Sequence, residues 1–116
     1  MEVFFLVGTS ITEIFIGEDR CLGITVNLPK TMLMTIVVPE VGYIMCGVLN
    51  VSAMDLLHAD REIIAGRVIR VKDFDDMLQA EIESITNKGQ EIGISPGMKG
   101  EKALKKMIDY KKANQS

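Results

Sequence analysis

Cysteine and histidine are the side chains of this sequence best suited to nucleophilic chemistry, and the chain has two cysteines and one histidine. Cys46 lies between Met45 and Gly47, at the end of an apolar segment. Backbone amides of a turn there would stabilise a thiolate, so Cys46 is a candidate catalytic nucleophile. Catalysis also needs a base within reach, and no local pattern ties His58 to this thiol. A small buried core residue is the alternative interpretation of Cys46.

Lys30 and Arg67 are a second pair of candidates, because each follows a residue with special backbone geometry, Pro29 and Gly66. If both side chains point into one concave place, they would bind an anionic group, to which arginine offers two parallel hydrogen bonds. Structural ion pairs are the alternative, with three candidate acidic partners: Asp73, Glu81 and Glu83.

Other chemistries have weaker support. Three glycines in residues 93–100 precede a predicted helix, a setting that suits phosphate, but the Lys-Ser/Thr end of a phosphate loop is missing. One histidine and two cysteines 25 residues apart give no metal-ligand spacing, and no Ser-His-Asp arrangement can be assembled. Asp73, Asp75 and Asp76 are the acidic first turn of a helix before they are a cation site. We expect neither a metal nor a cofactor.

The first half of the chain reads as strands. Residues 11–16 and 20–28 form a predicted hairpin around the turn residues Gly17, Glu18 and Asp19. Pro29 ends the second strand. Residues 32–38 are a nearly continuous apolar strand, a pattern typical of a strand covered on both faces. A turn at residues 39–42 then leads into a fourth strand at residues 43–46.

Helices alternate with strands in the second half. Ser52 and Asp55 fit a capping box for a helix over 52–61. A strand over 63–71, a helix over 73–80, a strand over 82–86 and a turn or short helix over 87–92 follow. After a loop at 93–97, a last helix over 100–112 buries one stripe: Ala103, Leu104, Met107 and Ile108. We predict one α+β domain over residues 1–116, with a frayed tail at 113–116.

The composition, 47% apolar and 25% charged in 116 residues, is that of one globular domain. Its net charge of −3 hides an asymmetry: residues 1–98 sum to −7 and residues 99–116 to +4. The basic last helix is either a solvated face or a surface that pairs with the acidic body of a neighbouring copy.

Membrane, secreted and nucleic-acid-binding classes fit poorly. The early apolar run at residues 3–7 is too short to span a bilayer and has no basic residue before it. Two cysteines make no disulfide framework, which favours the reducing cytoplasm. A pI of 5.1 and the absence of tryptophan argue against nucleic acid.

The high content of apolar residues favours assembly into an oligomer. Mean hydropathy is +0.22 and the chain carries eight methionines, while only short helices are available to cover its strands. Strand edges and an apolar hairpin need a cover, and a second copy is the simplest one. The alternative is that one monomer buries all of this surface.

A set of motifs resembles the YunC-like domain of unknown function found in bacteria and archaea, over about residues 14–108. These motifs are Leu28-Pro29-Lys30-Thr31, Gly42-Tyr43-Ile44-Met45-Cys46-Gly47, Ala65-Gly66-Arg67, Glu83-Ser84-Ile85-Thr86, Gly93-Ile94, Gly97-Met98, Gly100 and Ala103-Leu104. The resemblance implies an α+β domain whose N-terminal strands build a tetramer, and it implies no reaction. Thr86 joins Lys30 and Arg67 as a candidate ligand-binding residue. Asn50 and Arg70 depart from the pattern, which favours Asp and Gly there, and residues 1–7 are extra length that would add a strand at the interface.

We therefore favour a cytoplasmic homo-oligomer, a tetramer built through its N-terminal strands, that binds a small anionic ligand or a partner. The alternative is a cysteine-dependent enzyme that uses Cys46 on a small anionic substrate, and a purely structural scaffold stays open. The sequence names no substrate.

Overall fold

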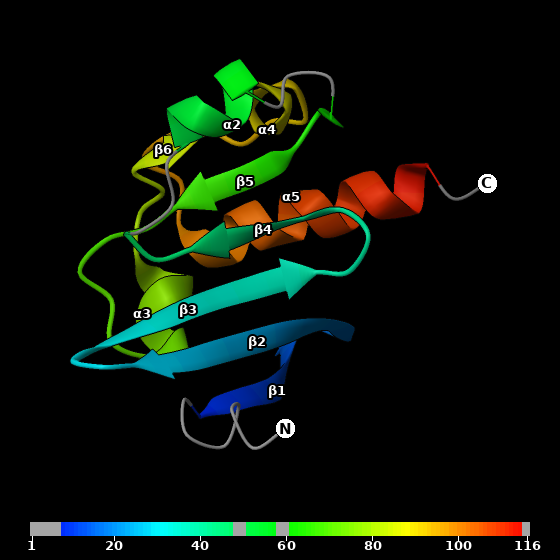
Figure 1. Ribbon diagram of the computed structural model, residues 1–116. Helices are drawn as coiled ribbons and strands as arrows, with labels where there is room; N and C mark the ends of the chain where they lie inside the picture. Colours follow the sequence, from blue (N-terminus) through cyan, green and yellow to red (C-terminus); the bar gives the residue numbers. More distant parts are fainter. Residues whose placement is uncertain (1–7, 48–50, 58–60, 115–116) are drawn as a thin grey trace.

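A computed structural model describes residues 8–47, 51–57 and 61–114 of the chain. Within these residues, one six-stranded sheet has its strands side by side in the order of the sequence (Figure 1). The strands are β1 (Thr9–Ile16), β2 (Asp19–Leu28), β3 (Thr31–Val38), β4 (Gly42–Met45), β5 (Ile64–Arg67) and β6 (Ser84–Ile85). Neighbours are antiparallel except β4 and β5, which are parallel.

The helices of the described residues all follow β4: α2 (Val51–Leu57), α3 (Phe74–Gln79), α4 (Asn87–Glu91) and α5 (Gly100–Ala113). Parallel strands cannot be joined by a tight turn, and α2 lies in the crossover from β4 to β5. Helix α5 packs against β1, β3, β4 and α3, and lies behind the sheet in Figure 1. This arrangement places the main core between α5 and one face of the sheet.

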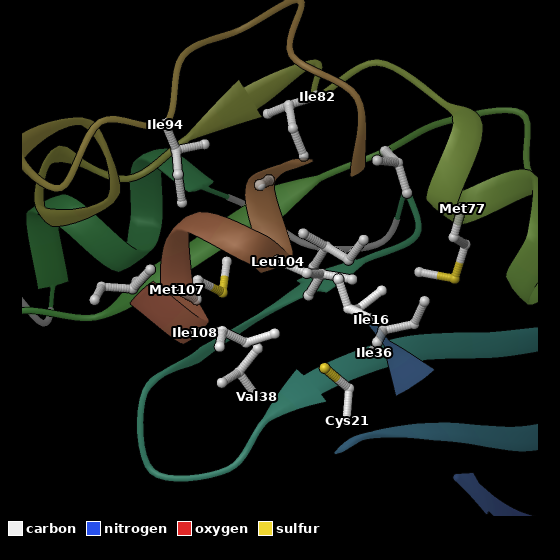
Figure 2. Close-up of a cluster of buried hydrophobic side chains, with 14 of the residues drawn as sticks. Ile16, Cys21, Ile36, Val38, Met77, Ile82, Ile94, Leu104, Met107 and Ile108 are labelled. Carbon is white, nitrogen blue, oxygen red and sulfur yellow. The ribbon is translucent and has the colours of Figure 1, made fainter. Parts of the chain in front are cut away.

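The core is built from the predicted stripe of α5 and from alternate residues of the strands. Ala103, Leu104, Met107 and Ile108 are all buried, as expected. Figure 2 shows the last three of these near Val38 of β3, with Cys21 of β2 close by. Burying a side chain as large as leucine contributes about 1.5–3 kcal/mol to the stability of the fold. The packing of α5 therefore stabilises the sheet.

The opposite face of β1–β3 has no described helix over it. We call it the open face. Alternation and strand register define its residues, which are Thr9, Ile11, Glu13, Phe15, Arg20, Leu22, Ile24, Val26, Leu33, Thr35 and Val37. Ile11 is 67% exposed and Phe15 57%. Residues 32–38 were predicted to be covered on both faces. In the single chain, the described helices cover only one face of β3. Over β4 and β5, α2 covers this side of the sheet with Val51 against Ala65.

Most predicted elements are confirmed. Four strands precede α2, and a mixed second half ends in a long helix, as an α+β fold requires. Asp73 caps α3, its side chain accepting a hydrogen bond from the amide of Asp76 at 2.7 Å. Of the two alternatives predicted at 87–92, a turn or a short helix, the structure has the helix, α4.

The capping box predicted for α2 is wrong. Ser52 is the second residue of α2 rather than the residue before it. The Asp55 carboxylate instead accepts a hydrogen bond from the amide of Asn87 at 3.0 Å. Asp55 therefore ties α2 to the start of α4, a contact between residues far apart in the sequence.

The strand predicted over 63–71 is too long, because β5 ends at Arg67. Val68 turns into the core and is fully buried. Arg70 has a φ of 61°, a left-handed conformation that costs an L-residue roughly 1–2 kcal/mol. The strand predicted over 82–86 is reduced to the two residues of β6. The strain at Arg70 explains why glycine suits that position in the pattern the sequence resembles.

The basic end of α5 pairs with acidic turns of its own chain. Lys111 Nζ lies 3.5 Å from a carboxylate oxygen of Glu40, and Lys112 Nζ lies 3.0 Å from one of Asp19. Cations at the last turn also suit the helix dipole. Ala113, which was predicted to fray, is the last residue of α5, and Asn114 caps the helix by donating a side-chain hydrogen bond to the Tyr110 carbonyl.

No helix in the described part of the chain combines the length and the apolar character needed to cross a bilayer.

Substitution of Gly100 by alanine tests the close packing of α5 on α3. A Cβ there would lie 2.1 Å from the carbonyl oxygen of Met77, so we expect Gly100→Ala to lower the free energy of unfolding by about 1–3 kcal/mol in urea denaturation. Gly47→Ala is the matched control, because its Cβ would lie 3.6 Å from its nearest neighbour. Equal stability of the two variants would contradict this packing.

Candidate functional site

Arg67 lies at the carboxyl end of β5, in register with Met45 at the end of the parallel strand β4. Its Nε donates a hydrogen bond to the carbonyl oxygen of Gly47 at 3.1 Å. Its Nη1 donates to Oε1 of Glu83 at 3.1 Å. The side chain keeps 33% of its surface exposed. Arg67 therefore ties the end of β4 to the segment entering β6 while its guanidinium still faces solvent.

Glu83 is held as an anion beside this guanidinium. Ser84 Oγ donates a hydrogen bond to Oε1 of Glu83 at 2.8 Å. That bond, and then the positive charge of Arg67, lower the pKa of Glu83 against an opposing effect of desolvation. Because the carboxylate stays charged, it fixes the orientation of the Arg67 side chain. One of the structural alternatives weighed for Arg67, an ion pair with Glu83, is the arrangement present.

Cys46 is buried beside β3 rather than exposed at a turn. The side chain is 9% exposed, and its Sγ accepts a long hydrogen bond from the amide of Met34 at 3.5 Å. Alternation along the chain directs the thiol to the face opposite the one on which Arg67 lies. His58 is outside the described residues. The buried interpretation of Cys46 fits this geometry, and its role as a nucleophile stays a prediction.

Lys30 lies apart from the other candidates, in the turn between β2 and β3. It is exposed and has a φ of 61°. The turn projects past the end of β4, since Thr35, five residues later, is the β3 residue paired with Met45. The structure thus brings Arg67 beside the backbone of Gly47 and leaves Lys30 in the turn of the β2–β3 hairpin. Figure 1 shows this hairpin.

Thr86 is fully buried, and its hydroxyl is already saturated. Oγ1 donates to the carbonyl of Ile63 at 2.6 Å and accepts from the amides of Ala65 at 3.2 Å and Gly89 at 3.3 Å. A hydroxyl has one donor and two acceptor positions, so these bonds use all of them. Thr86 joins β5 to α4 and caps that helix; its predicted ligand-binding role is not tested by this geometry.

Gly47 and Ser84 are the members of this site that the sequence analysis did not select. Ser84 of β6 is the residue paired with Arg67, and Gly47 supplies a backbone carbonyl rather than a side chain. The role of Gly47 has no local signal, because it depends on β4 and β5 becoming neighbours, whereas the bond from Ser84 to Glu83 joins adjacent residues and gains importance only because Arg67 lies beside them. Only the resemblance motifs that include these residues pointed to them.

A cavity of about 230 Å³ between α2 and α4 has Lys88 in its wall. The Lys88 Nζ lies 3.9 Å from a carboxylate oxygen of Glu62 and 3.7 Å from one of Glu91. The same ammonium group lies 5.9 Å from the centre of the Tyr110 ring. Among the described residues, no group of three or more His, Cys, Asp or Glu side chains is placed to hold a metal ion.

These observations define an α+β protein whose mixed sheet carries an arginine–carboxylate cluster at the carboxyl end of its parallel strand pair. The chain belongs to the family described as a domain of unknown function (DUF1805), which matches residues 45–107. The matched span begins at the last residue of β4, so it contains Cys46, Arg67 and Thr86 but not Lys30.

Two relatives agree with this assignment. The chain is 40% identical over 99 residues to the uncharacterized protein YunC of Bacillus subtilis (strain 168), covering 85% of this chain and 97% of that protein. The fold of this chain is similar to the crystal structure of a protein of unknown function from Thermoplasma acidophilum, with a TM-score of 0.74 and 31% sequence identity. The similarity covers 85% of this chain and 92% of that one. The YunC-like resemblance of the sequence is confirmed.

Substitution of Thr86 by valine tests the structural role of its hydroxyl. Valine keeps the shape but leaves two backbone amides and a carbonyl without their partner, so we expect a loss of about 2–3 kcal/mol in the free energy of unfolding. Thr86→Ser keeps the hydroxyl and should lose about 0.8 kcal/mol for one methyl group. A valine variant as stable as the serine variant in urea denaturation would contradict this role.

Thiol reactivity tests the interpretation of the two cysteines, both of which are free and buried. Burial, with the Asp19 carboxylate adding to it, raises the pKa of the Cys21 thiol. We expect both thiols of the native protein to react with an aromatic disulfide reagent on the order of 100-fold more slowly than in the urea-unfolded chain, because reaction requires local opening. A fast thiol that disappears in Cys46→Ala would instead favour the cysteine-enzyme alternative.

Proposed function

We propose that this protein is a cytoplasmic homo-oligomeric binding domain. Copies assemble into a tetramer through their N-terminal strands β1–β3, with the open face joining one pair of copies and the outer edge of β1 joining the pairs, and each copy binds a small ligand. The single observation that carries the assembly is the uncovered apolar face, on which Ile11 and Phe15 are more than half exposed in the single chain.

The composition of the open face supports association. Seven of its side chains are large and apolar: Ile11, Phe15, Leu22, Ile24, Val26, Leu33 and Val37. Contiguous apolar patches on soluble proteins mark interaction surfaces once they exceed a few hundred Å². The outer edge of β1 adds a row of backbone groups that no described strand pairs. A surface of this kind needs a partner of the same character.

A second copy suits this face because the face is electrically neutral. Its only charged side chains are Glu13 and Arg20, which form an ion pair at 3.0 Å within the chain. A neutral apolar surface meets its own copy without repulsion between like charges, as the self-complementary interface of a symmetric oligomer requires. The basic residues Lys111 and Lys112 already have acidic partners in their own chain, so they are not needed to hold copies together.

Two further observations support the rest of the proposal. The free thiols of Cys21 and Cys46 suit a reducing compartment. The exposed guanidinium of Arg67, at the end of adjacent parallel strands, suits a ligand site, because ligands of α/β sheets commonly bind at the carboxyl ends of strands.

Light scattering coupled to size exclusion tests the assembly. At micromolar concentration we expect a mass near four times the chain mass of 12.8 kDa. Ile11→Glu places a charge in the buried interface and should lower the mass to that of two chains or one, because an unpaired charge there costs several kcal/mol. It should leave the monomer folded, since Ile11 is exposed there.

Leu56→Glu is the matched control. Leu56 is 81% exposed, on α2 and away from β1–β3, so this variant should keep the mass of the unmodified protein. A monomeric unmodified protein, or equal masses for the two variants, would overturn assembly through the open face. A dimer that Ile11→Glu dissociates would correct the number of copies alone.

A further inference from the structure

The helices that follow β4 and β5 lie on opposite faces of the sheet. After β4 the chain enters α2, which packs on the same side as the open face through Val51 and Ala65. After β5 it enters α3, whose Met77 is buried in the core on the α5 side. The carboxyl ends of the parallel strands β4 and β5 therefore lie between helices on opposite sides of the sheet, and α/β proteins commonly bind ligands beyond the carboxyl ends of parallel strands.

Arg67 places an incompletely used guanidinium at this position. The group has five N–H donors, and within the described residues two hydrogen bonds are made, by Nε to Gly47 and by Nη1 to Glu83. Nη2 lies 3.6 Å from where a Cβ on Gly47 would be. Because Gly47 has no side chain, nothing of that residue extends over Nη2. Donors therefore remain for a ligand on a side chain whose orientation is already fixed.

Glu83 shows which chemistry this guanidinium accepts. A carboxylate oxygen already binds Nη1 at 3.1 Å, and arginine binds carboxylate and phosphate through parallel hydrogen bonds. The same carboxylate opposes a second anion nearby, because like charges repel. Ser84 holds Glu83 through its hydroxyl, which keeps this negative charge beside the site.

We propose that Arg67 anchors an oxyanion-binding site, in which its guanidinium binds the carboxylate or phosphate group of a small ligand at the carboxyl ends of β4 and β5. Glu83 orients the arginine and weakens the binding of the anion. This inference rests on the ligand-binding part of the proposed function and not on assembly, because all the groups named belong to one chain. Neither Lys30 nor Thr86 takes part.

Nuclear magnetic resonance titration of the full-length protein tests this site. Inorganic phosphate and acetate are the probes, each added at constant ionic strength against chloride, and the readouts are the Arg67 Nε–H signal and the amides of Gly47 and Ser84. Saturable shifts with phosphate alone indicate a phosphate ester as the ligand class, and shifts with acetate alone indicate a carboxylate. Shifts with both indicate a general oxyanion site.

Three variants separate binding from a merely structural role of Arg67. Arg67→Lys keeps the charge and loses the paired donors, so it should weaken binding about tenfold. Glu83→Gln keeps an oxygen acceptor and removes the competing charge, so it should strengthen binding by up to about fivefold. Arg20→Lys is the matched control: Arg20 also pairs with a glutamate, and this variant should leave the affinity unchanged.

The proposal is overturned if neither anion shifts the Arg67 signal. It is also overturned if Arg67→Lys binds the anion as tightly as the control Arg20→Lys and the unmodified protein do. It is also overturned if Glu83→Gln, folded by circular dichroism, gains no affinity. Light scattering on the same samples reports assembly separately, so a monomer that still binds phosphate would reject the oligomer and keep the site.

Discussion

The packing of α5 on one face of the sheet is the interaction on which the rest of this structure depends. Helix α5 has 14 residues and packs against β1, β3, β4 and α3, so the core on one face of the sheet is built around this helix. Gly100 allows α5 to start against the backbone of Met77, where any side chain would collide. On the other face, the seven residues of α2 cover only the part formed by β4 and β5. The exposure of β1–β3 on that face follows from this unequal supply of helices.

The motif Ala65-Gly66-Arg67 shows how the same packing positions the candidate site. Ala65 is fully buried under α2. Gly66 faces the other way, where a Cβ would lie 3.2 Å from Ile85 and 3.3 Å from Ile82, so glycine lets β5 lie close to the segment entering β6. Arg67 is the first residue beyond these contacts. Its side chain therefore emerges at the rim of the sheet, within reach of Glu83.

The features that the sequence predicted are those that depend on local spacing. The stripe on α5 follows from a period of 3.6 residues, and the cap at Asp73 from its own first turn. The failures involve partners far along the chain. The Asp55 carboxylate accepts a hydrogen bond from the amide of Asn87, 32 residues away, rather than capping its own helix. The extent of β5 was misjudged because the apolar residues after Arg67 suit a strand as well as a core loop. For the candidate site, the Arg67–Glu83 pair was among the options weighed, whereas the separation of Lys30 from Arg67 depends on strand order.

One cross-strand row joins the two proposed surfaces. Register places Ile11 at one end of this row and Arg67 with Ser84 at the other, with Met45 beside them beneath α2. An exposed ion pair such as Arg67–Glu83 contributes about 0–1 kcal/mol, so stability alone gives little reason for charges here. An apolar pair at these positions would extend the open face to the end of β5 and offer copies a second, incorrect register. The charges therefore end the apolar surface at α2, so the proposed association surface ends where the proposed anion site begins.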